Sequence, residues 1–167
     1  MKRHHTSNQR RGAVAVEAAF ALTLLVVLLL GLWEVGRLVQ VNQIVNNAAR
    51  EGARLAAGGY TNGTPVTAAM VQQAAKDYMT SAGLPATAVS GSQVSLICQA
   101  TPMWTDPSAA LPLDEFQVKI VIPAGAAFNS LKWTLLSSMT SATQMSTTVT
   151  WESLNDTVLT VPTNLPF

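Results

Sequence analysis

Only 11% of the 167 residues are charged, which is less than half of the roughly one quarter that is usual for a soluble domain. The first twelve residues hold no acid and four basic side chains: Lys2, Arg3, Arg10 and Arg11. No basic patch with interleaved aromatics follows them, so the sequence argues against a nucleic-acid partner. Both histidines, His4 and His5, also lie in this basic leader, which argues against a zinc site or a catalytic histidine in the folded part.

The first predicted element after the leader is an apolar helix over residues 13–33, in which Glu17 is the only charged residue. Twenty-one residues at about 1.5 Å each give roughly 30 Å, enough to cross the hydrocarbon core of a bilayer. The basic leader 1–12 predicts that the N-terminus stays in the cytoplasm. The sequence therefore predicts a single membrane span, with the rest of the chain on the periplasmic side of a bacterial inner membrane.

Three interpretations compete for this segment. A cleaved secretory signal fits the basic head and the apolar run, but bulky and charged residues follow Leu32 where a small-residue cleavage site should stand. The second interpretation is a signal anchor that is never cut. The third is a pilin-type leader that is cut between Gly12 and Ala13, ahead of the apolar run.

Glu17 favours the pilin-type interpretation, because a charge inside a membrane segment is costly and points to a function. A cut after Gly12 would expose a positive amino group on Ala13. The carboxylate of Glu17 lies about one helical turn along, or beside the amine of a neighbouring subunit. Pairing the two charges relieves the cost of holding either one alone in lipid. In an uncut anchor, Glu17 would instead sit in the headgroup zone.

The helix is predicted to continue over residues 34–57, with no proline before Pro65 and a stop at Gly58-Gly59. Its apolar positions are rich in small residues: Val35, Leu38, Val41, Val45, Ala48, Ala49, Gly52, Leu55 and Ala56. Small residues let another helix approach closely, so this face suits packing into a filament. The same face is also suited to covering the sheet of its own chain.

Two groups of charged residues on this second half are candidate helix contacts. Glu34 and Arg37 stand three apart and are expected to share one helix face. Arg50, Glu51 and Arg54 form the second group. Each group is either a solvated pair or a contact with another subunit.

These residues carry a family resemblance. Glu34-Val35-Gly36-Arg37 and the run from Asn47 to Arg54, read with the glutamate that opens the apolar run, resemble the N-terminus of TadE-like proteins. The resemblance implies a minor pilin-like component of the tight adherence (Flp-type) pilus, processed by a prepilin peptidase. It implies that Gly12 and Ala13 flank the cut and that Glu17 serves recognition and assembly.

Residues 58–167 are predicted to form a periplasmic α+β domain. Asn62-Gly63 indicates a turn, after which Thr64-Pro65 should begin a second helix that ends near Ser81. Period-two alternation predicts strands over residues 93–100, 115–122 and 144–151, with a third helix between Phe128 and Met139 and an irregular tail after Asn155. The expected fold is a long helix packed on a small antiparallel sheet, as in pilin-like subunits.

The acids of this domain are few and lack a histidine partner, so we expect no enzyme, no metal and no cofactor. Cys98 is either a small buried apolar side chain or a thiol for intermolecular pairing. The partners expected are membrane lipid, a prepilin peptidase, other pilin-like subunits and the pilus assembly platform. The alternative function is that of an uncleaved, single-span anchor that carries a periplasmic binding domain.

Overall fold

The computed structural model describes residues 7–132 and 144–155, and it confirms a mixed α+β chain with a long N-terminal apolar helix and small antiparallel sheets. The chain divides into two compact units, Met1–Val39 and Gln40–Phe167, which are described separately below. Helix α1, Ser7–Ala57, contributes to both units. It ends where the sequence predicted and begins six residues before Ala13. The tail after Asn155 and most of the predicted third helix lie outside the described residues.

Within the first unit, the part of α1 from Ala13 to Trp33 is apolar on all sides, with Glu17 as its one charged residue. Apart from Leu30, which is of intermediate exposure, its large apolar side chains are more than half exposed, among them Val14, Val16, Phe20, Leu32 and Trp33. An 18-residue window has a mean hydropathy of 2.6, with none of its residues buried. Gly12–Ala57 is thus the one helix among the described residues that is long and apolar enough to cross a membrane. A helix that is hydrophobic all round and unburied is suited to lipid rather than to water.

The part of α1 in the second unit is amphipathic, and its apolar face is buried. Val45, Ala48, Ala49 and Ala53 are fully enclosed. Gly52 marks a close approach to the second helix, because a Cβ there would lie 3.4 Å from Cγ1 of Val71. The small residues of this face therefore do serve the chain's own domain, which was one of the two uses expected of them.

A short hairpin follows α1, with strands β1, Tyr60–Thr61, and β2, Thr64–Pro65. Asn62 and Gly63 both have positive φ, 49° and 76°, as a two-residue type I′ turn requires. This turn folds Thr64 back beside Thr61. The prediction that Thr64-Pro65 begins the second helix is therefore wrong.

Helix α2, Ala68–Ser81, instead begins after Thr67, whose hydroxyl accepts the Met70 N–H at 3.4 Å. Asp106 adds a second cap from a distant loop, since its carboxylate accepts the Ala68 N–H at 2.8 Å. Two unpaired donors at the helix start are thereby satisfied. A short helix that the sequence did not predict, α3, Ala86–Gly91, follows α2.

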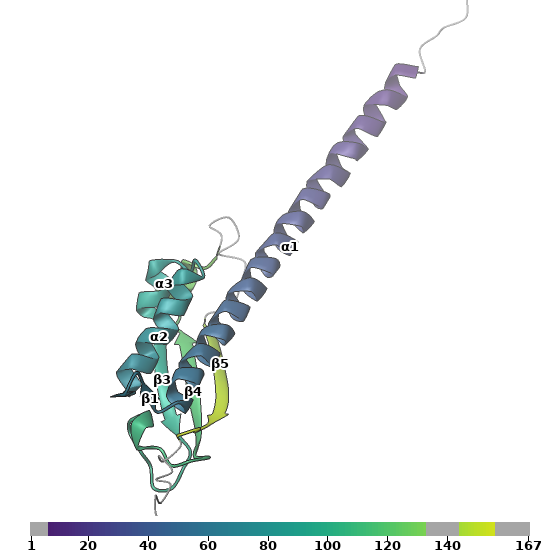
Figure 1. The fold of residues 1–167 in the computed structure, drawn as a ribbon. Helices are drawn as coiled ribbons and strands as arrows, with labels where there is room; N and C mark the ends of the chain where they lie inside the picture. Colours follow the sequence, from purple (N-terminus) through teal and green to yellow (C-terminus); the bar gives the residue numbers. More distant parts are fainter. Residues whose placement is uncertain (1–6, 133–143, 156–167) are drawn as a thin grey trace, which may run out of the picture. The chain divides into compact units, whose positions relative to one another are not determined.

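Three antiparallel strands form the main sheet, in the order β3-β4-β5 (Figure 1). They span Gln93–Cys98, Glu115–Ile122 and Met145–Glu152, which confirms the three predicted strands to within two residues at each end. On β4, Phe116, Val118, Ile120 and Ile122 are buried and alternate with accessible residues. Since directly opposite residues share a face, the register places Val94, Leu96 and Cys98 beside them on β3, and Met145, Thr147, Val149 and Trp151 on β5.

The connections close the core around this face of the sheet. A 3₁₀ turn, η1, Pro107–Ala109, lies between β3 and β4, and a short helix, α4, Ala126–Asn129, follows β4. Phe128 and Leu131, which fall within the predicted third helix, are buried. Trp104 meets the Phe116 ring edge-on, with centroids 5.8 Å apart.

Candidate functional site

The predicted processing and assembly residues lie on the exposed, apolar part of α1. The backbone is helical without interruption through Gly12 and Ala13, and a Cβ at Gly12 would meet no atom within 4 Å. Glu17 is exposed and stands four residues after Ala13, so the two share a helix face one turn apart. Thr23 donates its hydroxyl to the Ala19 carbonyl at 2.9 Å, which satisfies this polar group without a partner from solvent.

Glu34 and Arg37, the first pair of candidate helix contacts, differ in their environments. Glu34 is only 2% exposed, whereas Arg37 faces solvent. A nearly enclosed carboxylate is unusual, since acids are seldom fully buried without a partner. Their assignment as a contact between subunits stays a prediction.

Glu51 and Arg54, from the second group, form an ion pair along one face of α1. The Arg54 guanidinium donates from Nη2 to Oε1 at 2.7 Å and from Nε to Oε2 at 3.0 Å. These hydrogen bonds hold the pKa of Glu51 below its usual value. Arg50 is exposed on the same polar side. Because the pair is accessible to solvent, it adds little stability to the helix.

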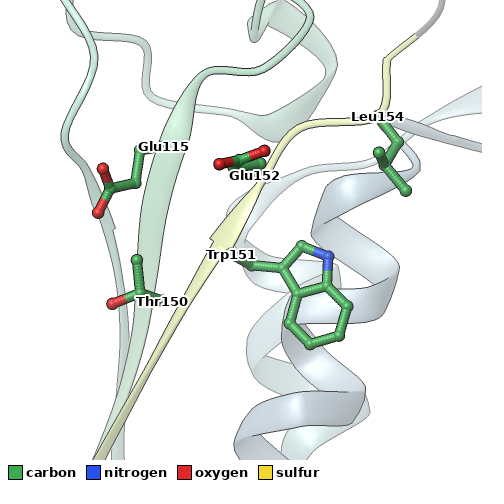
Figure 2. A pocket seen from close by; sticks show the side chains of 5 residues that line it. All are labelled: Glu115, Thr150, Trp151, Glu152 and Leu154. Atoms are coloured by element: carbon green, nitrogen blue, oxygen red, sulfur yellow. The ribbon is translucent and has the colours of Figure 1, made fainter.

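A pocket of about 470 Å³ lies at the end of β5, and it was not predicted from the sequence. Glu115, Thr150, Trp151, Glu152 and Leu154 line it (Figure 2). Glu115 and Glu152 are directly opposite each other in the register of β4 and β5. The sequence shows that Trp151 and Glu152 point to opposite faces of a strand, but it does not show the register that brings Glu115 and Glu152 together.

The remaining candidate chemistry of the domain is sparse. The carboxylate of Asp114 accepts the Leu111 N–H at 2.7 Å and so closes a turn at the start of β4. Within residues 7–132 and 144–155, no three His, Cys, Asp or Glu side chains are grouped as a metal site would need. Cys98 is half-buried as a free thiol, in register with Phe116.

Together these features define a small protein with an N-terminal apolar helix suited to membrane anchoring and an α+β unit that follows it. Residues 12–54 match the family model for TadE-like protein, which confirms the resemblance carried by the N-terminal motifs. The matched segment suggests an association with the Tad pilus, and the TadE-like family is a pilus component that is not known as an enzyme family. No curated protein and no solved structure matches the chain.

Proposed function

We propose that the chain is a minor pilin-like subunit that takes part in assembly of a tight adherence, Flp-type pilus, after a prepilin peptidase cuts it behind Gly12. The observation that carries the proposal is the placement of Glu17. The TadE-like match begins at Gly12, and Glu17 lies one turn beyond Ala13 on a helix that is otherwise apolar and exposed.

The cut has a physical rationale at this position. Glycine is a poor helix former, about 1 kcal/mol less favourable than alanine, so the helix opens more easily at Gly12 than within the leucine-rich run. Among the described residues, no atom lies within 4 Å of where a Cβ at Gly12 would stand. Removal of the leader takes away four basic side chains and leaves one amine on Ala13. That single charge is one that Glu17 can neutralise.

Glu17 then serves assembly, because two opposite charges replace one unpaired acid in an apolar setting. Several kcal/mol oppose an isolated ion in a low-dielectric medium, and a close partner offsets much of this. The partner is the Ala13 amine of the same chain or of a neighbouring subunit. The exposed apolar part of α1 faces lipid before assembly and other pilin-like subunits or the assembly platform afterwards.

The intact mass of protein purified from native membranes tests the processing step. We expect the mature chain to lack its first twelve residues. Gly12→Leu should retain them, whereas the matched control Gly31→Leu should be processed normally, since a Cβ at Gly31 also meets no atom within 4 Å. A full-length wild-type mass in a piliated strain would contradict processing.

An exchange of two neighbours tests the assembly role of Glu17. Val16→Glu combined with Glu17→Val keeps the composition and hydropathy of the helix but turns the acid by about 100°. We expect insertion to persist and pilus formation to fall sharply, whereas Glu17→Asp should retain most of it. Normal piliation in the exchanged variant would rule out a specific role for the position of Glu17.

The proposed topology places unit 2 on the periplasmic side, and the hairpin tip provides a probe. Asn62 is exposed there. In a Cys98→Ser background, Asn62→Cys should react with a membrane-impermeant maleimide in intact spheroplasts. Reaction only after permeabilisation would place this unit in the cytoplasm and overturn the topology.

The second candidate function is that of an uncut anchor with a periplasmic binding domain. The observation that favours it is the unbroken helix through Gly12 and Ala13, because a peptidase needs the scissile peptide bond unwound. A full-length mass together with normal pilus formation when Glu17 is neutralised would favour this function over the first.

A further inference from the structure

Among the described residues, strand β5 has one edge that is not paired with another strand. Among the described residues, β4 is the one strand that pairs with it, through eight consecutive positions without a bulge. Natural edge strands are commonly blunted by lysine, proline or a bulge. Met145–Glu152 contains neither lysine nor proline. The second edge of β5 is thus a template for another strand.

The two faces beside this edge differ in chemistry. Trp151 and Leu154 lie on the side of the strand that faces the helix, and Glu115, Thr150 and Glu152 lie on the other side (Figure 2). Trp151 is 38% exposed although it continues the apolar row of Val149. The pocket at the end of β5 therefore has one apolar side and one acidic side.

The acidic side lacks a cation of its own in the described part of the chain. Glu115 and Glu152 face each other across the two strands, an arrangement of like charges that is unfavourable by a few tenths of a kcal/mol or more. No ion pair forms with either one among the described residues. Lys119 is on the same face of β4 but four residues away from Glu115, about 13 Å along the strand.

We propose that the edge of β5 binds an extended segment of another protein in which apolar residues alternate with lysine or arginine. Side chains of an added strand point alternately to the two faces of the sheet. The apolar ones would therefore lie beside Val149 and Trp151, and the cationic ones beside Glu152 and Glu115. The added strand also satisfies the open backbone groups of β5.

Charge identifies the occupant as a different protein rather than a second copy. The two edge strands of the sheet, β3 and β5, contain no lysine or arginine. A copy that docked through either strand would leave the two glutamates unneutralised. The surface lies in the second unit and does not depend on the cut behind Gly12.

The test uses the full chain in detergent micelles and fluorescence anisotropy of labelled heptapeptides. The probe has alternating lysine and valine between terminal threonines. One control peptide has glutamate in place of every lysine, and another keeps the lysines but carries N-methyl groups on its valine amides. We expect the lysine peptide to bind at least about tenfold more tightly than either control.

Variants link the binding to the proposed surface. Glu115→Gln with Glu152→Gln should weaken the lysine peptide about tenfold, and lysine at both positions should shift the preference to the glutamate peptide. Asp77→Asn, which removes an exposed acid from α2, is the matched control and should have no effect. Failure of the lysine peptide to bind, equal binding of the N-methylated peptide, or undiminished binding to the double glutamine variant would each overturn the proposal.

Discussion

Replacing Gly59 with alanine is expected to destabilise the second unit by about 3 kcal/mol. Gly59 has a φ of +62°, a conformation that costs an L residue roughly 1–2 kcal/mol. The added Cβ would also lie 2.7 Å from Cγ and Oδ1 of Asn155. The Asn155 side chain must then move, although its amide donates to the carbonyls of Ser108 at 3.3 Å and Ala110 at 3.1 Å. Each lost hydrogen bond adds about 1 kcal/mol.

Urea unfolding of the full chain in detergent micelles, followed by tryptophan fluorescence, measures this loss. Gly63→Ala is the matched control, because Gly63 also has positive φ, +76°, but a Cβ there meets nothing within 4 Å. It should cost only about 1 kcal/mol, from the backbone alone. In an Asn155→Ala background, Gly59→Ala should likewise cost about 1 kcal/mol, since the clash is gone. Equal losses for Gly59→Ala and Gly63→Ala in the wild-type background would refute the reasoning.

Two further substitutions probe the polar contacts of the helices. Asp106→Ala removes the carboxylate that accepts the Ala68 N–H, so the free energy of unfolding should fall by about 1 kcal/mol in the same urea assay. The control Asp77→Ala, which loses only an exposed hydrogen bond from Gln73, should change it by no more than about 0.5 kcal/mol. Glu51→Gln should reduce the loss of thermal stability below about pH 4. The hydrogen bonds from Arg54 lower the pKa of Glu51 in the folded state. The stability that Glu51 contributes is therefore present above its unfolded-state pKa and is lost as the pH falls through its folded-state pKa. The effect should be small because the pair is solvent-accessible, and an unchanged pH profile would show that Glu51 contributes nothing.

The elements with a strict period could be predicted from the sequence. Strand β4 has the predicted bounds because its buried residues, Phe116, Val118, Ile120 and Ile122, alternate with more accessible ones over its whole length. The start of α2 was misplaced because Thr64-Pro65 resembles a helix start, while the Asn-Gly pair before it specifies a hairpin. These two local signals conflict, and the structure follows the hairpin because Thr64 and Pro65 pair with Thr61 and Tyr60. The sequence alone does not show that this pairing forms.

The candidate sites differ in the same way. Gly12, Ala13 and Glu17 lie on one helix, so spacing along the chain already gives their relation in space. The pocket at β5 depends on Glu115 and Glu152, which are brought together by strand register across a long connection. In the sequence, Glu115 and Glu152 are far apart, and only the register of β4 and β5 brings them together as the acidic side of one surface.

The burial of α1 also limits how the proposed fibre subunit can associate with its neighbours. After Val39, the small apolar residues of the helix are already buried in their own domain, and Gly52 packs closely against α2. Forming an apolar contact with a neighbour through this face would require the second unit to open. In the proposed fibre, helix packing between neighbouring subunits therefore involves the exposed apolar residues before Trp33. The second unit can associate through its polar helix face or through the edge of β5. This division is consistent with the proposed assembly role of Glu17, which is the only charged residue between Ala13 and Trp33.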